Sequence, residues 1–493
     1  MLNVMDLFKR TIEMGAASAM TDCQFFEQEI RRWKASDGRK KQIDGQRYYM
    51  GQHDILDYKR TVIGVDGSLR EVHNLPNNRI IDNQYAKMVD QKRNYLLGQP
   101  IAYQTSNKTY EAALKKVFGK GFDRMMQNLG KDSLNCGIGW VYVYYDSAGK
   151  LSFKQLKPYE VLPFWQDDGH TALDYVVRLY EVETYEGQDL RTIEKVEIYK
   201  VTGIECYELA DGALIPDSES PVVPYITNAD GSTVKGLNWG RIPIIGFKFN
   251  DEETPLICRV KSLQDGINRA LSDFQNNMQE DSRNTILIIK NYDGENLGEF
   301  RYNLATYGAV KVKSIDGVEG GVDALQVEVN AENYQMVHKI LKAALIENAM
   351  GYDAKDDRMS GSPNQMNIQS MYSDVDLDAN GMETEYQASF EELLWFVNTH
   401  LANTGQGNFD GEELEVIFNR DMMMNESDII NNIRNSVGIL SDETLVAQHP
   451  WVDNVQLELK RLEKESQRKA DEYDDAAAGK DNGGGQYENG EAA

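Results

Sequence analysis

VKSLQDGINRALSDFQNNMQ at residues 260–279 and NYQMVHKILKAALIENAM at 333–350 are two helix-like stretches on either side of a strand-rich insert. In each stretch, apolar residues recur at steps of three and four, which lays one apolar stripe along a helix. The residues that we expect to pack are Leu263, Ile267, Leu271 and Phe274 in the first stretch, and Val337, Leu341 and Leu345 in the second. Ser262 is the predicted N-cap of the first helix. Each helix therefore has a face that needs a partner.

The insert between the two helices is rich in strand-forming residues. The runs TILIIK at 285–290, GAVKVK at 308–313 and LQVEV at 325–329 predict strands. Asp-Gly pairs at 293 and 316 predict turns between them. Two helices that lead out to a small β module and back describe a stalk with a tip.

The polar segment YDAKDDRMSGSPNQ at 352–365 follows the second helix. It mixes acidic and basic residues and contains few apolar ones. Gly361 is a candidate hinge, and Pro363 is expected to end the mobile stretch. The pattern predicts a flexible loop directly after the stalk.

Length and composition indicate a protein of several domains. The chain has 493 residues, of which 41% are hydrophobic and 27% charged; a prior based on length suggests about three domains. No stretch approaches the roughly 18 apolar residues of a membrane helix, and the N-terminal MLNVMDLFKR lacks the apolar block of a signal peptide. We therefore expect a cytoplasmic protein. The four cysteines are far apart, which favours neither a zinc site nor a disulfide framework.

The formal net charge is −27, from 79 acidic and 52 basic residues. Non-specific affinity for DNA comes from lysine and arginine side chains that neutralise phosphates, so this balance argues against a protein that coats nucleic acid. Two interpretations stay open. The acidity can serve solubility alone, or it can belong to a surface that lies near DNA without binding it tightly.

Along the chain, the signals change from helix to strand and back. Residues 1–60 have helical character and carry a basic cluster between Arg31 and Lys41, most simply a solvated helix face. A helix is predicted from Asn78 to Gly98, strands from Gly139 to about Phe249, and one long helix from Ile368 to Leu401. A strand, further helices from Glu426 to about Tyr473, and a Gly- and Asn-rich tail follow, and the tail is expected to be disordered.

Catalytic signatures are missing from the sequence. It contains no GxxxxGK[ST] phosphate loop, HExxH, GxSxG or strand-linked GxGxxG, and its six histidines are scattered. One partial match is a calcium-loop pattern in which Asp376, Asp378 and Asn380 would be ligands. Gln387 stands where a bidentate glutamate is needed, and a continuous helix here would splay the ligands apart. We predict no enzyme, no cofactor and no metal.

Several stretches, taken in order, carry a resemblance to a known family. They are YYMGQHDI at 48–55, NNRIIDNQYAKMVDQKRNYLLGQPI at 77–101, GIGWVYVYYDSAGKLSFKQLKPYEVLPFW at 137–165, RIPIIGFKFND at 241–251, SLQDGINRALSDFQNNMQ at 262–279 and SGSPNQMNIQSMYSDVDL at 360–377. With the stalk, tip and flexible loop, the chain resembles the portal proteins of tailed double-stranded DNA phages, of the SPP1 type. The resemblance covers about 400 residues and depends on order and spacing.

The resemblance implies an α+β, multidomain portal fold in a ring oligomer, typically a dodecamer. By position, the implied parts are an N-terminal helical segment (1–60), the strand-rich part of the wing (61–255), a first stem helix (256–283), a small α/β clip (284–330), a second stem helix (331–351), a tunnel loop (352–365), the long wing helix with the strand after it (366–424), helices of the crown (425–472) and a disordered tail (473–493).

The function implied is that of a structural channel at one capsid vertex, through which DNA is packaged and ejected. The implied partners are double-stranded DNA, bound without sequence specificity, the large subunit of the terminase motor, the head-tail adaptor, and the major capsid and scaffolding proteins. No membrane partner is implied. The protein would occupy the virion, and the host cytoplasm during assembly.

The tunnel loop is the candidate for contact with DNA in the channel. Its residues of interest are Asp353, Lys355, Asp356, Asp357, Arg358, Ser360, Gly361 and Ser362. Their mixed charges would give a weak and reversible hold on DNA.

Two other functions stay open at this point. One is another ring-forming or scaffold component of the virion, for which the 284–330 insert would not be needed to bind motor and adaptor. The other is a DNA-packaging enzyme such as a nuclease or ATPase, which would need the phosphate loop or metal-binding acids that the sequence lacks.

Overall fold

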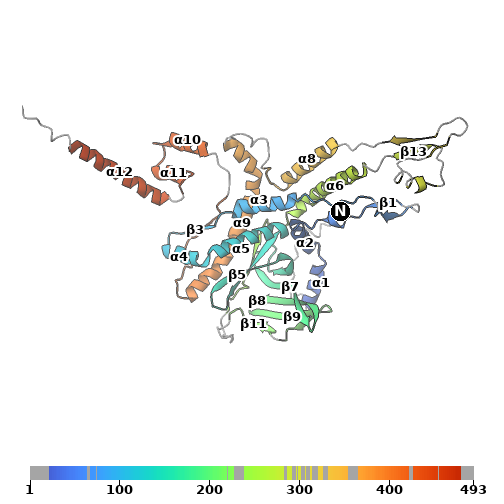
Figure 1. The fold of residues 1–493 in the computed structure, drawn as a ribbon. Coiled ribbons are helices and arrows are strands. Elements are labelled where there is room, and N and C mark those ends of the chain that lie inside the picture. Colours follow the sequence, from blue (N-terminus) through green and yellow to red (C-terminus); the bar gives the residue numbers. More distant parts are fainter. Residues whose placement is uncertain are drawn as a thin grey trace, which may run out of the picture. The chain divides into compact units, whose positions relative to one another are not determined.

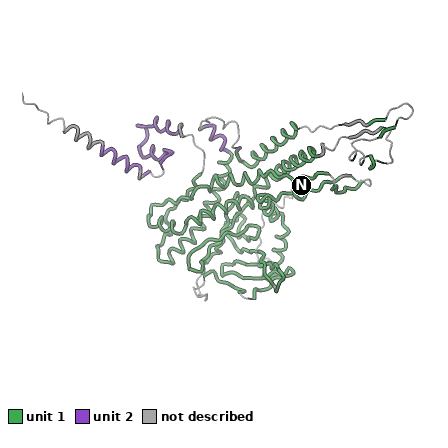
Figure 2. Tube along the Cα trace, in the orientation of Figure 1, with its two compact units in different colours: residues 1–352, 374–421 green, residues 353–373, 422–493 purple. Residues whose placement is uncertain are grey.

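The computed structural model describes residues 21–478 except 64–66, 74, 219, 227–237, 282–285, 291–295, 297, 301, 303–305, 307–310, 314–319, 326–330, 354–364, 421–425 and 453–454. The chain divides into two compact units, drawn in green and purple in Figure 2. Unit 1 comprises residues 1–352 and 374–421, and unit 2 comprises 353–373 and 422–493. Both large hydrophobic cores belong to unit 1.

Antiparallel strands form the sheets of unit 1 (Figure 1). The largest has the order β10-β9-β8-β7-β6, with β11 paired to β9. Its strands are β6 (Val161–Trp165), β7 (Leu173–Glu186), β8 (Asp189–Lys200), β9 (Gly203–Ala210), β10 (Ala213–Pro216) and β11 (Val222–Val223). A second sheet has the order β12-β4-β5, from β4 (Ile138–Tyr145), β5 (Leu151–Leu156) and β12 (Ile244–Lys248). The predicted strand-rich region is thereby confirmed.

Three shorter pairs complete the strands of the described residues. They are β1 (Thr61–Ile63) with β2 (Leu69–Glu71), β3 (Ala102–Gln104) with β15 (Glu415–Ile417), and β13 (Ile286–Lys290) with β14 (Gly321–Leu325). The β3–β15 pair joins positions about 310 residues apart, with Val416 opposite Tyr103. Such a long-range pairing ties the chain on both sides of the stalk into one unit.

Helices cover these sheets and build two cores. Helix α1 (Asp22–Lys34) starts with a capping box at Thr21 and buries Phe26 and Ile30 against the large sheet. The other core lies between the β12-β4-β5 sheet and helices that include α3, α5 and α9. The bounds are α2 (Asp37–Tyr49), η3 (Asp54–Asp57), α3 (Gln84–Leu97), α4 (Lys108–Val117), α5 (Lys120–Cys136), η4 (Pro158–Glu160) and α9 (Gln365–Asn403).

The two helices of the predicted stalk are α6 (Ile257–Asp281) and α8 (Ala331–Asn348), and Figure 1 shows them side by side. The insert contributes the β13–β14 pair, in which Ile288 lies opposite Asp323. The predicted strand TILIIK is therefore present. GAVKVK and LQVEV fall largely outside the described residues, as do the two predicted turns, although Val312 forms a bridge and Leu325 ends β14.

Two predicted helix starts are wrong. Helix α6 begins at Ile257, so Ser262 lies inside it, because Pro255 and Leu256 already accept the first turn's hydrogen bonds from Cys258 and Arg259. Helix α3 begins at Gln84 rather than near Asn78, and Asn83 caps it by accepting a hydrogen bond from the Ala86 amide at 3.0 Å.

An unusual polar ladder joins α6 to the segment that leads into α3. The side chains of Gln264, Asn268, Ser272 and Asn276 are all buried, at spacings of four along α6. They accept hydrogen bonds from the backbone N–H groups of residues 85, 82, 80 and 78, at 2.9, 3.1, 2.9 and 2.7 Å. The segment therefore runs along α6 without a strand partner, and side chains of the helix satisfy its buried donors.

Unit 2 contains the helices near the C-terminus and the start of α9. These helices are α10 (Glu426–Ser436), α11 (Asp442–Ala447) and α12 (Val455–Ala478). Ser441 caps α11 by accepting from the Thr444 amide. The predicted helices from Glu426 onward and the long helix from Ile368 to Leu401 are confirmed, and the tail beyond 478 lies outside the described residues.

Candidate functional site at the junction of four helices

The predicted packing residues of the stalk divide into buried and exposed sets. Ile267 and Leu345 are fully buried. Leu263, Leu271, Phe274 and Leu341 are half-buried, and Phe274 contacts Tyr334 of α8 with 5.1 Å between ring centroids. Val337 is 46% exposed in the single chain, together with its neighbours Met336 and Ile340. The inner faces of α6 and α8 therefore meet, while α8 keeps an uncovered apolar face.

Helix α8 ends in a Schellman motif. The Gly351 amide donates to the Ile346 carbonyl and the Met350 amide to the Glu347 carbonyl, both at 2.9 Å. Met350 adopts the left-handed conformation, with φ of 52°, which costs a non-glycine residue about 1 kcal/mol. The next residue, Gly351, packs closely on α3, since a Cβ there would lie 2.5 Å from Met88 Sδ and the methionine side chain would have to shift.

Helix α3 holds the residues that follow this motif. Gln91 Nε2 donates to the Tyr352 carbonyl at 2.9 Å, and its Oε1 accepts from the Tyr352 amide at 3.0 Å. Lys92 Nζ donates to the Met350 carbonyl at 3.0 Å. Met88, Gln91 and Lys92 stand at positions i, i+3 and i+4, so one face of α3 contacts all three residues at the end of α8.

Lys92 also joins α3 to two further helices. Its Nζ lies 2.7 Å from Asp378 Oδ2 of α9, while Arg259 of α6 donates to Asp378 Oδ1 at 2.9 Å. The Lys92 and Asp378 side chains are only 5% and 10% exposed. Burial lowers the pKa of Lys92, and the charge of Asp378 opposes that change. Helices α3, α6, α8 and α9 therefore meet at one buried ion pair.

The three residues of the partial calcium pattern lie within the continuous helix α9 and contact basic side chains. Asp378 pairs with Lys92 and Arg259, as above. Asp376 accepts from Arg420 at 2.6 Å and from the Tyr95 hydroxyl at 2.5 Å, and Asn380 also accepts from Arg420. These side chains link α9 to α3 and to the segment after β15, which gives them a packing role in place of the ligand role in that pattern.

Most of the candidate DNA-contacting loop lies outside the described residues. This applies to Lys355, Asp356, Asp357, Arg358, Ser360, Gly361 and Ser362. Asp353 is described and is half-buried. What the structure adds is the fixed start of the loop, at Met350, Gly351 and Tyr352.

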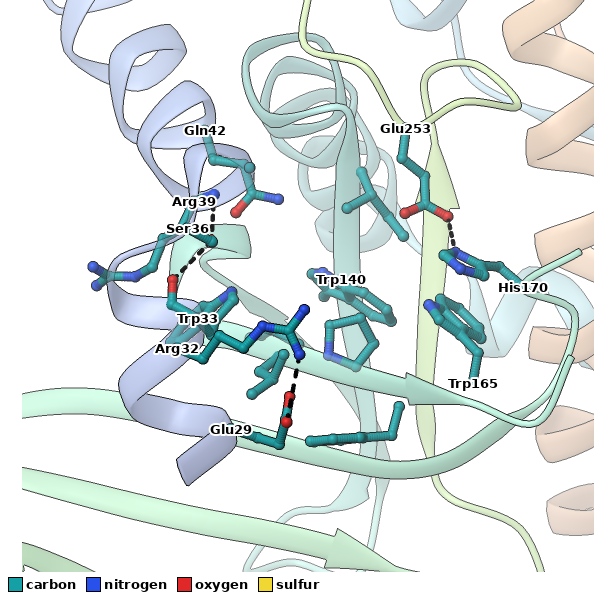
Figure 3. Close-up of a pocket in the computed structure, with 16 residues that line it drawn as sticks. Glu29, Arg32, Trp33, Ser36, Arg39, Gln42, Trp140, Trp165, His170 and Glu253 are labelled. Atoms are coloured by element: carbon teal, nitrogen blue, oxygen red, sulfur yellow. Dashed lines mark hydrogen bonds and ion pairs between the residues drawn. The ribbon is translucent and has the colours of Figure 1, made fainter. Parts of the chain in front are cut away.

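A separate cavity of about 350 Å³ lies among α1, α2 and the two large sheets (Figure 3). Trp140 and Trp165 stack at 5.9 Å between ring centroids, and His170 pairs with Glu253 at 2.6 Å. The indole nitrogens of both tryptophans are buried and have no hydrogen-bond partner among the described residues, so they do not offer donors to solvent in the cavity. The walls of the cavity are therefore mixed: aromatic and aliphatic side chains line it together with charged ones such as Glu29, Arg32 and Arg39.

Metal and membrane sites are not found in the described part of the chain. No group of three or more His, Cys, Asp or Glu side chains there is placed to hold a metal ion. Among the same residues, no helix combines the length and the apolarity needed to cross a bilayer.

Sequence reasoning missed the polar ladder and the Gln91–Lys92 contact. A signal for the ladder existed, because Gln264, Asn268, Ser272 and Asn276 recur every four residues beside the apolar stripe. Lys92 stands in the apolar stripe of its helix, four residues from both Met88 and Leu96, so the spacing indicated its burial but not its partners. Gln91 gave no signal, since a polar side chain beside such a stripe is normally solvated.

A model of the family described as phage portal protein, SPP1 Gp6-like, matches residues 34–472. The chain belongs to this family. The resemblance given by the sequence stretches is thereby confirmed, and the chain is a structural portal protein of the phage virion rather than an enzyme. The mixed helix-and-sheet fold agrees with the predicted class.

Relatives of the family match over most of their length. The portal protein of Bacillus phage SPP1 is 29% identical over 435 residues, covering 87% of this chain and 84% of its own. The portal protein of Clostridium phage phiCD119 is 26% identical over 451 residues, covering 87% and 94%. A solved chain from the neck of an empty gene transfer agent particle is more remote, with 14% identity, a TM-score of 0.37, and coverage of 73% of this chain and 88% of that one.

Proposed function

We propose that twelve copies of this chain close into a ring at one capsid vertex, and that DNA enters and leaves through its central channel. The observation that carries the ring is the uncovered apolar face of α8. Met336, Val337 and Ile340 are 56%, 46% and 58% exposed in the single chain. An apolar face of this kind is stabilised when a neighbouring subunit covers it.

In a closed ring, the exposed apolar face of α8 is covered by a neighbour in every subunit. A heterologous contact places one surface of a subunit against a different surface of the next, and a closed rotation leaves no copy without a neighbour. In this assembly α6 and α8 are the two stem helices, residues 284–330 the clip, and α10 to α12 the crown. The strand-rich region 61–255 and the long helix α9 are the wing.

The loop at 352–365 is the proposed site of contact with DNA. Its DAKDDR stretch mixes three acidic with two basic residues, which gives partial attraction to phosphates without tight binding. The net charge of −27 on each chain acts in the same direction, because a channel that lets DNA slide must not bind the phosphates strongly.

The clip is the proposed docking surface for the large terminase subunit during filling and for the head-tail adaptor afterwards. The major capsid and scaffolding proteins are the proposed partners of the rest of the ring's outer surface. Deleting residues 284–330 is therefore expected to abolish binding of both the motor and the adaptor. If such a ring still bound both, the alternative of another ring-forming virion component would be favoured.

Shortening the loop between residues 353 and 362 tests the proposed channel role. This polar segment contributes little apolar burial, so ring assembly measured by native mass spectrometry should be unchanged. DNA packaging or retention in assembled heads should fall severalfold. Normal filling by a ring with the shortened loop would remove the loop from the mechanism.

A further inference from the structure

The exit from α8 is held from outside the stalk. Met350, Gly351 and Tyr352 all contact α3, and the contacts differ in kind: a lysine donor on the Met350 carbonyl, close packing at Gly351, and both polar backbone groups of Tyr352 paired with Gln91. Tyr352 is the last residue before unit 2 begins at Asp353. The chain is thus fixed up to the position at which the candidate loop begins.

Two features at this exit need an external partner. Met350 stands in a left-handed conformation that its side chain disfavours, so the turn needs support from neighbouring contacts. The Tyr352 amide lies beyond the last bond of the Schellman motif, which ends with Gly351, so the helix itself supplies no acceptor for it. Gln91 supplies both the missing acceptor and a donor to the Tyr352 carbonyl.

We propose that Gln91 and Lys92 are positioning residues that fix the backbone of Met350 to Tyr352, the three residues directly before the loop at 353–364. Gln91 fixes the backbone at Tyr352. Lys92 couples the Met350 carbonyl to Asp378 of α9, the helix that begins just after the loop, and through Asp378 to Arg259 of α6. These contacts hold the end of α8, helix α9 and helix α6 in place relative to α3. The effect on DNA rests on the channel role proposed above.

Substitutions at Gln91 separate this role from general stability. Gln91→Met removes both hydrogen bonds to Tyr352 while keeping a side chain of similar size. Gln91→Glu keeps the acceptor for the Tyr352 amide and loses the donor to the Tyr352 carbonyl. Gln127→Met on α5 is a matched control. Gln127 is also half-buried, and its side chain makes no hydrogen bond to another described residue. Amide hydrogen exchange at Tyr352 in the assembled ring is the direct measurement.

The expected result is exchange at Tyr352 about tenfold faster in Gln91→Met, with most protection retained in Gln91→Glu and no change in Gln127→Met. Lys92→Met should speed exchange across residues 350–352. Unchanged exchange at Tyr352 in Gln91→Met would overturn the proposal, as would equal loss of protection in Gln91→Glu and Gln91→Met.

DNA packaging by the same rings distinguishes this inference from the proposed function. A severalfold loss of packaging in Gln91→Met, with ring mass unchanged, is expected if the loop contacts DNA. If exchange at Tyr352 rises while packaging stays normal, the positioning contact stands and the channel role of the loop fails.

Discussion

Lys92 Nζ and Asp378 Oδ2 lie 2.7 Å apart in a site where both side chains are almost fully buried. Replacing Asp378 by alanine would leave the lysine buried without its counter-charge. Because an unpaired buried charge is costly, we expect a loss of about 3–5 kcal/mol in the free energy of unfolding, measured by denaturant titration. Glu391→Ala, at an exposed position of the same helix, is the control and should change stability by less than about 0.5 kcal/mol.

A double substitution sharpens this prediction. Lys92→Met combined with Asp378→Leu removes both charges, so the pair should be more stable than Asp378→Ala alone. A double variant as unstable as the sum of its two single variants would contradict a direct interaction between the residues.

The polar ladder on α6 predicts different effects for two serines of that helix. Ser272→Ala would leave the partly buried Ile80 amide without its acceptor, at a cost of about 1–2 kcal/mol. Ser262→Ala should be nearly neutral, because Ser262 is exposed and lies inside the helix. A loss near 1 kcal/mol for Ser262→Ala, typical of a removed N-cap, would instead place the helix start at Ser262.

Asp132 of α5 gives a prediction on pH. Burial raises the pKa of its carboxyl from 3.8 to about 6, while Gln155 Nε2 donates to its Oδ2 at 2.5 Å. With the folded pKa above the unfolded one, the stabilising contribution of Asp132 is complete below about pH 4 and is lost as the pH rises through 6. We therefore expect Asp132→Asn to be more stable than the parent at pH 8, by about 1–3 kcal/mol.

The difference between these two proteins should shrink to about 0.5 kcal/mol near pH 4, where the parent carboxyl is protonated in the folded state and partly protonated in the unfolded state. Melting temperatures measured at both pH values check this. A stabilisation of the same size at pH 4 and pH 8 would assign the effect to something other than ionisation.

The exposed face of α8 predicts a variant that folds but does not assemble. Val337→Asp places a charge on a residue that is exposed in the single chain, so the fold and its circular dichroism should be retained. The charge would be buried in the ring, so assembly measured by native mass spectrometry should be strongly weakened. Gln335→Asp adds the same charge at an exposed polar position of α8, and a smaller effect is expected.

Periodicity was enough to predict α6, α8, α9 and the strand-rich region, because a single apolar stripe or an alternating run determines each of them. The local pattern placed the start of α6 at Ser262, whereas the helix begins at Ile257, where the amides of Cys258 and Arg259 already donate to the carbonyls of Pro255 and Leu256. The entry to α3 was missed for a different reason. Residues 78–83 have a helical pattern, but the backbone amides of 78, 80 and 82 donate hydrogen bonds to side chains of α6. This is a tertiary contact, which a local sequence pattern does not predict.

The candidate site also has one part that local spacing predicts and another that depends on contacts between distant parts of the chain. The packing stripe of the stalk could be predicted from spacing, with the difference that Val337 is exposed in the single chain. The contact of Gln91 with Tyr352 joins positions about 260 residues apart and depends on how α3 lies against the end of α8. The partners of Asp376 and Asp378 in α9 could not be predicted either, because only the fold places Lys92, Arg259 and Arg420 beside them.

Native mass spectrometry of the purified full chain, with negative-stain microscopy of the same sample, tests the proposed assembly most directly. We expect a closed ring with a central hole and a mass twelve times the 56.0 kDa of one chain. A stable monomer at micromolar concentration, or particles without a central hole, would contradict it.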